Sequence, residues 1–245
     1  IRQKASFDQE RILQIEAEVR HDVIAFLTNV NENVGDSGRY IHVGMTSSDV
    51  LDTGLSLQIK ASLQLLQIEL QGLEEAIRVL AKLHKNTVMI GRSHAIHGEP
   101  ITFGFKLAGW LAETIRNSER LKRLEKDISV GQISGAMGTY ANTDPEVERL
   151  TCESLNLSPD TASTQVISRD RHADYVQTLA LVAASLDRFA TEIRNLQRTD
   201  VLEVEESFYN LQSANHGIIS SKKEVIASKE ALRLARLRFK AGVTT

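Results

Sequence analysis

The longest uninterrupted helical pattern in the sequence runs from Asp49 to about His84. Leucine or isoleucine recurs along it in alternating steps of three and four residues, at Leu63, Leu66, Leu70, Leu73, Ile77 and Leu80. This spacing places one apolar stripe along a helix that would be roughly 50 Å long at 1.5 Å per residue. Because a small compact domain cannot bury so long a rod, the pattern predicts a long-helix bundle.

Helical periodicity also covers most of the remaining sequence up to about residue 206. It predicts helices over residues 6–29, 101–128 and 145–155, and a last one that begins near residue 171. We expect Pro100 in the first turn of the helix over 101–128, where its missing N–H costs nothing. No segment shows the alternation typical of strands, so the expected fold class is all-α.

Composition excludes several classes of protein. The 245 residues carry a formal charge of −3, which gives no overall basic field for nucleic acid. No apolar run approaches the roughly 20 residues of a membrane span, and the charged start carries no signal peptide. One cysteine, Cys152, excludes an internal disulfide and a cysteine-based zinc site. These features favour a cytoplasmic protein, and the start at Ile1 suggests a fragment of a longer one.

Charge divides the chain near residue 207. Residues 207–245 carry a net charge of +5, which leaves −8 for residues 1–206. We therefore expect a partial N-terminal helical domain over 1–47, an incomplete central bundle over 48–206, and a basic helical tail of different origin over 207–245. An ordinary basic amphipathic helix is an equally good interpretation of that tail.

Three polar breaks separate the predicted long helices: "GRSHAIHGEP", "VGQISGAMGTYANTDP" and "NLSPDTASTQVISRD". Connections at the ends of rigid helices often carry functional sites. In the first break, His94 and His97 could be metal ligands, acid–base groups or polar turn residues. The metal interpretation is the weakest, because glycines and a proline argue against a helix there and no further ligand cluster is present.

Acid–base chemistry requires only an imidazole with a pKa near neutral and a group that orients it. Candidates are His21, His42, His94, His97 and His172. Each could equally be a hydrogen-bonded turn residue. In the same way, "TSSD" could be a helix cap or an anion site, and "GAMGTYAN" could be a flexible turn or a loop that presents backbone amides to a ligand.

Six stretches resemble the adenylosuccinate lyase family of the fumarase/aspartase superfamily over about residues 1–206. They are "ASFDQERILQIEAEVRHDVIAF", "HVGMTSSDVLDT", "GRSHAIHGEPITFGFKLA", "GQISGAMGTYANTDPEVE", "STQVISRDRHADY" and "EIRNLQRTDVLEVEE". The resemblance implies a cytoplasmic, all-α homotetramer whose active sites gather loops from three subunits. It implies elimination of fumarate from adenylosuccinate, and from the succinylated imidazole carboxamide intermediate, in purine biosynthesis. Neither a metal nor an organic cofactor, nucleic acid or membrane is expected.

The resemblance also implies roles for individual residues. His94 matches the general acid that protonates the leaving nitrogen, and His42 matches a histidine that supports it. The matches to substrate-binding positions are Arg20, His21, Asp22, Thr46, Ser47, Ser93 and Gln165. His97 is expected to support the site from outside or to be a turn residue.

The sequence departs from the family after "LEVEE". The family's base is a serine in a loop that reads roughly S-S-x-M-P-x-K-x-N-P, and no such sequence occurs in the chain. Residues 207–245 instead weakly resemble a helical segment of outer-membrane efflux channel proteins. The resemblance also implies about fifty further N-terminal residues and a C-terminal helical domain, and we expect both to lie outside this chain. We therefore expect little or no lyase activity from this chain alone. The alternative hypothesis is a non-catalytic helical scaffold or interaction protein derived from a lyase.

Overall fold

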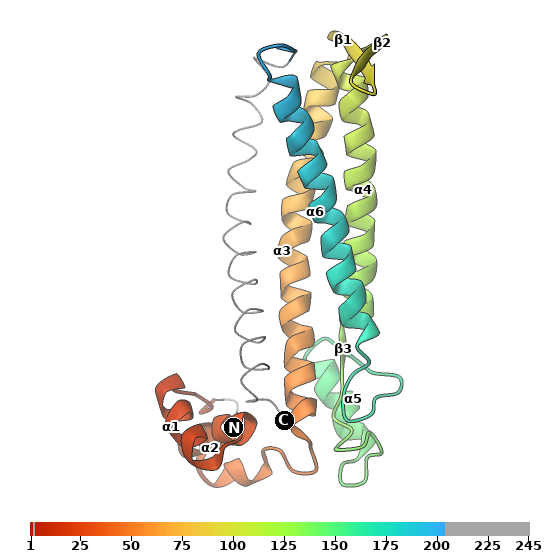
Figure 1. The fold of residues 1–245 in the computed structure, drawn as a ribbon. Helices are drawn as coiled ribbons and strands as arrows, with labels where there is room; N and C mark the ends of the chain where they lie inside the picture. Colours follow the sequence, from red (N-terminus) through yellow and green to blue (C-terminus); the bar gives the residue numbers. More distant parts are fainter. Residues whose placement is uncertain (2, 204–245) are drawn as a thin grey trace. The chain divides into compact units, whose positions relative to one another are not determined.

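The structure of the chain, a computed structural model, describes residue 1 and residues 3–203. These residues form two compact units, one of residues 1–61 and 126–173 and the other of residues 62–125 and 174–203. Three helices contribute residues to both units: α3 (Ser47–Leu83), α4 (Phe103–Ile128) and α6 (Asp170–Leu196). Helix dominates the described chain (Figure 1), which confirms the predicted all-α class. The long helix predicted from Asp49 is confirmed as α3.

The first unit begins with two helices where the sequence predicted one. They are α1 (Gln9–Val19) and α2 (Asp22–Val34), followed by the 3₁₀ helix η1 (Gly35–Tyr40). The break falls at Arg20, whose φ of 55° is left-handed, and at His21, which is extended. The apolar period continues in phase across this break, so periodicity alone predicted a single helix.

The rest of the first unit surrounds a short parallel pair of strands, β3 (Val130–Gly131) and β4 (Ser158–Pro159). Helix α5 (Pro145–Ser154) lies between them in sequence and agrees with the short helix predicted there. Side chains buried in this part of the unit are Ile128, Val130, Ile133, Cys152, Leu157 and Ile167. Their burial fixes the loops on either side of α5, which carry several of the candidate site residues.

The second unit packs α3, α4 and α6 side by side (Figure 1) around one hydrophobic core. The buried members of that core are Ile77, Leu80, Met89, Phe103, Leu107, Trp110, Phe189 and Leu196. Trp110 of α4 stacks on Phe189 of α6, with ring centroids 4.7 Å apart and an interplanar angle of 16°. Aromatic pairs of this kind contribute beyond the area that they bury.

A β-hairpin in the second unit corrects the expectation that no strands form. Strand β1 (Val88–Ser93) pairs antiparallel with β2 (Ile96–Thr102), with a bulge between Ile90 and Arg92. Pro100 lies opposite Ile90 within β2 rather than in a helical turn, and α4 begins at Phe103. The hairpin shows no alternating pattern because, beyond the buried Met89 near its base, residues 92–100 are all exposed, so neither face of its outer part is buried.

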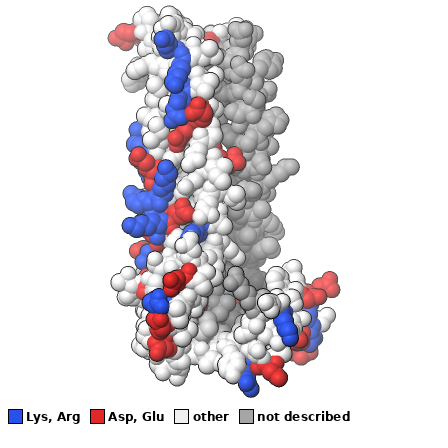
Figure 2. All heavy atoms as spheres, turned by 180° about the vertical axis from the view of Figure 1, so that it is seen from behind, with Lys and Arg blue, Asp and Glu red and all other residues white. Residues whose placement is uncertain are grey.

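Charge on the surface is mixed in sign. Figure 2 shows acidic and basic side chains interspersed on the face that it presents, as a formal charge of −3 would suggest. Among the described helices, none combines the length and the apolar character that crossing a bilayer requires.

Candidate functional site

A buried carboxylate organises the loops of the first unit. Asp49, in the first turn of α3, is 0% exposed. Its Oδ2 accepts the backbone N–H of Thr46 at 2.9 Å and that of Gly135 at 3.1 Å. Its Oδ1 accepts the backbone N–H of Ser134 at 3.3 Å. Because these donors lie on two loops, the carboxylate joins the "TSSD" turn to the "ISGAMG" loop.

The candidate residues Thr46 and Gln165 lie together in the first unit. Gln165 Nε2 donates to Thr46 Oγ1 at 3.5 Å, at the long end of the hydrogen-bond range. The fully buried Gln132 supports this loop, because its Nε2 donates to the backbone carbonyl of Gln165 at 2.8 Å. The Oγ atoms of Ser134 and Ser163 are 2.8 Å apart, which joins the "ISGAMG" loop to the loop of Gln165 a second time.

A second buried carboxylate, Glu148 of α5, holds the "ISGAMGTYAN" loop at two points. Its Oε2 accepts the backbone N–H of Ile133 at 2.7 Å, and its Oε1 accepts the phenol of Tyr140 at 2.7 Å. This hydrogen bond to the carboxylate, together with burial, raises the pKa of Tyr140 to about 12. These two hydrogen bonds tie the loop to α5.

The turn that carries His42 approaches the same loop closely. His42 is left-handed, with a φ of 70°, and its Nε2 is buried with no hydrogen-bond partner among the described residues. Two residues later, Gly44 has a φ of 71°, and a Cβ placed there would lie 2.2 Å from the carbonyl oxygen of Asn142. Only glycine fits such a position. The turn over residues 42–44 is thus in close contact, at Gly44, with the backbone of the "ISGAMGTYAN" loop.

Arg20, His21 and Asp22 lie on the surface of the first unit, between α1 and α2. His21 Nδ1 accepts the backbone N–H of Ile24 at 3.4 Å and also lies 3.4 Å from Asp22 Oδ1. The first contact requires that Nδ1 carries no hydrogen and the second that it carries one, so the two are alternatives. All three side chains are available to a ligand, since each residue is exposed.

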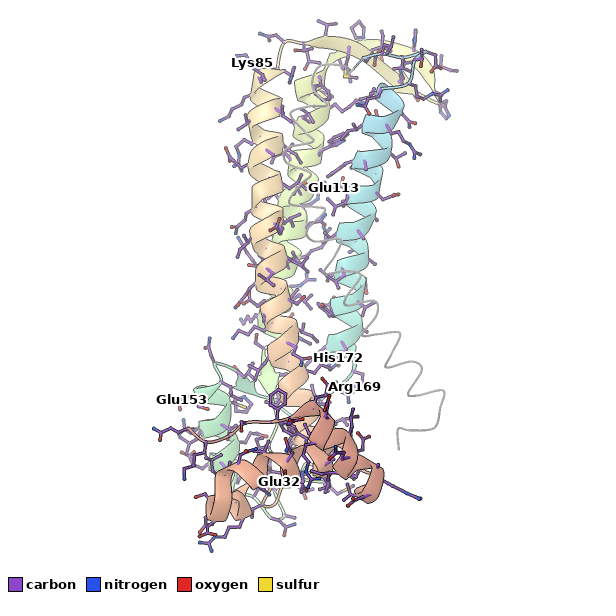
Figure 3. All side chains as sticks on the ribbon, turned by 90° about the vertical axis from the view of Figure 1, so that its left-hand side faces the viewer. Glu32, Lys85, Glu113, Glu153, Arg169 and His172 are labelled. Carbon is purple, nitrogen blue, oxygen red and sulfur yellow. The ribbon has the colours of Figure 1, made fainter. Side chains whose placement is uncertain are left out.

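The last loop of the first unit is held by an ion pair. Arg169 donates to both carboxylate oxygens of Asp52, at 2.9 and 3.1 Å, and Asp52 also accepts the backbone N–H of Ile167 at 2.9 Å. His172, in the first turn of α6, lies beside Arg169 (Figure 3). Burial, and then the positive charge of Arg169, lower the pKa of His172. Both effects favour the neutral form of the ring.

Ser93 and His94 belong to the second unit, where they form the turn of the β1–β2 hairpin. Ser93 pairs with Ile96, and the two residues between them, His94 and Ala95, have φ values of 54° and 61°. Two consecutive left-handed residues make a type I′ turn, the form that matches the twist of a hairpin. His94 is consequently exposed at the tip, and His97 lies opposite Arg92 within the hairpin.

Three side chains support these loops without being predictable from the sequence pattern: Asp49, Gln132 and Glu148. The "TSSD" pattern predicts that Asp49 lies at the start of a helix. It does not predict that the carboxylate joins two loops. Glu148 lies in a helix with the sequence "PEVERLTCES", whose charges are typical of a solvent-facing surface. In the part of the chain that the structure describes, no group of three or more His, Cys, Asp or Glu side chains could hold a metal ion.

The chain is similar in sequence to known proteins. A family model described as "Lyase" matches residues 1–214. The chain is 65% identical over 237 residues to the adenylosuccinate lyase of Synechocystis sp., covering 97% of this chain and 55% of the relative. It is 48% identical over 237 residues to the adenylosuccinate lyase of Bacillus subtilis, again covering 97% and 55%.

A solved structure with a similar fold is the fumarate lyase from Mesorhizobium sp. BNC1. Its TM-score is 0.77 at 31% identity, and the match covers 91% of this chain and 54% of that one. The chain thus spans about half the length of the relatives that it matches. The alignment of 237 residues with the Synechocystis relative extends well beyond residue 206. The predicted likeness of residues 207–245 to efflux channel proteins has no support among these comparisons. These residues lie outside the part of the chain that the structure describes.

Proposed function

The chain belongs to the lyase family whose model matches residues 1–214, and we propose that its function is that of an adenylosuccinate lyase. The reaction is the elimination of fumarate from adenylosuccinate, and from the succinylated imidazole carboxamide intermediate of purine biosynthesis. The observation that carries this proposal is the 65% identity over 237 residues with an adenylosuccinate lyase. The protein would act in the cytoplasm on small nucleotides, without a cofactor, as a homo-oligomer and by analogy a tetramer.

Elimination next to a carboxylate sets chemical requirements that the candidate residues can meet. A base removes a proton from carbon, an acid protonates the departing nitrogen, and hydrogen-bond donors stabilise the developing negative charge. We assign the acid to His94, whose imidazole is exposed at the tip of a hairpin fixed by two left-handed residues. His42 is assigned to support the acid and the bound succinyl group.

Substrate binding is assigned in part to polar groups of the first unit. Ser47 begins α3 and Thr46 directly precedes it, at a helix N-terminus where hydroxyl groups and backbone amides suit a carboxylate of the substrate. Gln165 contacts Thr46 and so extends this polar surface. The remaining assigned contacts are Arg20, His21, Asp22 and Ser93.

We further propose that this chain alone is impaired in the chemical step. The sequence S-S-x-M-P-x-K-x-N-P, which supplies the base in the family that the chain resembles, does not occur in it. Loss of one member of an acid–base pair lowers the rate by several orders of magnitude while ligand contacts persist. The chain should therefore still bind the nucleotide but convert it only slowly.

Calorimetric titration of the purified chain with adenylosuccinate and with AMP tests the proposal, together with an assay of fumarate release. We expect both nucleotides to bind, and fumarate to be released at least about 1,000-fold more slowly than by the Bacillus subtilis relative measured in parallel. Release at the relative's rate would refute the impairment. Binding of neither nucleotide by a chain with intact helical circular dichroism would favour the scaffold alternative.

His94→Gln tests the assignment of the acid, and His97→Gln is its matched control three residues away. We expect His94→Gln to lower any residual fumarate release by about 100-fold or more, because it removes the proton donor. His97→Gln should stay within about twofold of the native chain, because the histidine lies within a strand rather than at the hairpin tip. Equal losses in both variants would contradict the assignment.

A further inference from the structure

We propose that Asp49 is a positioning residue that fixes Thr46 against the Ser134–Gly135 turn, so that the side chains of Thr46 and the adjoining Ser47 are held in place to bind the succinyl end of the substrate. This inference rests on the proposed function and adds to it a residue that does not itself touch the ligand. Asp49 is 0% exposed, so a ligand cannot reach its carboxylate directly. Its effect has to pass through the groups that it holds.

The hydrogen bonds of Asp49 have a geometry that links two loops. The bonds from Thr46 N at 2.9 Å and Gly135 N at 3.1 Å end on the same oxygen, and the bond from Ser134 N at 3.3 Å ends on the other. Backbone N–H groups that donate to a carboxylate form charge-assisted bonds, which are stronger than neutral ones. In addition, the N–H of Asp49 donates to the Thr46 carbonyl at 3.0 Å, which closes a reciprocal pair across the start of α3.

The two loops also approach each other without intervening side chains. Gly135 has a φ of 80°, and a Cβ there would lie 3.2 Å from the carbonyl oxygen of Gly44. Such a close approach buries the backbone N–H groups of both loops. The Asp49 carboxylate provides the hydrogen-bond acceptor for these N–H groups. The side chain of Thr46, whose Oγ1 accepts from Gln165 Nε2, leaves this junction in a direction that the Asp49 bond fixes.

The side-chain amide of asparagine cannot replace the Asp49 carboxylate as a hydrogen-bond acceptor. In Asp49→Asn, one of the two oxygens becomes an NH₂ group that faces backbone N–H donors, so at least one of the three bonds is lost. Thr46 and the Ser134–Gly135 turn then become free to move relative to each other. Any ligand group that binds through Thr46 or the adjoining Ser47 should be held less well, whereas groups bound elsewhere should be affected less.

Adenylosuccinate and AMP separate these two effects, because only adenylosuccinate carries the succinyl carboxylates. For Asp49→Asn in the full chain, we expect the Kd of adenylosuccinate to rise about tenfold or more and the Kd of AMP to stay within about twofold. Glu148→Gln is the matched control: it changes an equally buried carboxylate that holds the same loop without contacting Thr46. Its two Kd values should shift in parallel.

The outcomes distinguish this inference from the proposed function. If the native chain binds both nucleotides and Asp49→Asn changes the two Kd values equally or not at all, the inference fails and the proposed function stands. If the native chain binds neither nucleotide, both fail. Should Asp49→Asn not fold, amide hydrogen exchange of the native chain decides: slow exchange at Thr46, Ser134 and Gly135 before ligand is added supports preorganisation, and exchange at the rate of open loops overturns it.

Discussion

The phenol of Tyr140 donates a 2.7 Å hydrogen bond to the carboxylate of Glu148, which is only 3% exposed. Tyr140→Phe removes this donor and leaves Glu148 Oε1 buried without a partner. An unsatisfied buried acceptor of this kind costs about 1–3 kcal/mol. We therefore expect the free energy of unfolding, measured by urea titration, to fall by about that amount.

Tyr175→Phe is the control for this prediction. Tyr175 OH lies 3.4 Å from Ser62 Oγ, a long contact between two neutral groups. Its removal should change the free energy of unfolding by no more than about 0.5 kcal/mol. If the two variants were equally stable, the contact between Tyr140 and Glu148 would not be holding the loop.

Apolar periodicity was sufficient to predict most of the helices. It marks the buried stripe of α3, α4 and α6 directly, because these helices bury one face and expose the other. It could not reveal the break at Arg20, where backbone dihedral angles change while the apolar period continues. Nor could it reveal the β1–β2 hairpin, whose turn depends on left-handed φ values at His94 and Ala95 and whose outer residues bury no face.

The candidate site was predictable in part and for a different reason. Its candidate ligand-binding residues were predicted from resemblance to a family, and the structure brings two of them, Thr46 and Gln165, into contact. The supporting residues Asp49 and Glu148 could not be found in this way. A buried carboxylate and an exposed one are the same letter in a sequence, and only the fold determines which backbone N–H groups surround it.

The low pKa of His172 predicts that the stability of the fold depends on pH. Burial and Arg169 lower that pKa in the folded state, against the smaller opposite effects of Asp52 and Asp170. The unfolded chain, with a histidine pKa of about 6.5, therefore binds the proton first as the pH falls. The free energy of unfolding should decrease as the pH drops through about 6.5 toward the lower folded pKa.

His172→Gln removes this contribution, because a glutamine does not titrate. Urea unfolding of the native chain and of the variant at a series of pH values between about 5 and 7.5 measures it. We expect a shallower slope for the variant. A native slope in His172→Gln would refute the prediction.

Gly44 and Gly72 make a matched pair for a final prediction about the loop contact beside His42. Gly44→Ala introduces a Cβ at a φ of 71° and 2.2 Å from the carbonyl oxygen of Asn142, so the backbone of one loop must move. Strained positions of this kind cost about 1–3 kcal/mol before any clash is counted, and we expect the free energy of unfolding to fall by at least about 2 kcal/mol. Gly72→Ala lies in the exposed middle of α3 with nothing within 4 Å of the new Cβ. It should raise the free energy of unfolding by about 0.5–1 kcal/mol, because alanine is the better helix former. Thermal and urea unfolding of the two variants give the comparison, and a neutral Gly44→Ala would mean that the turn at His42 does not contact the loop at Asn142.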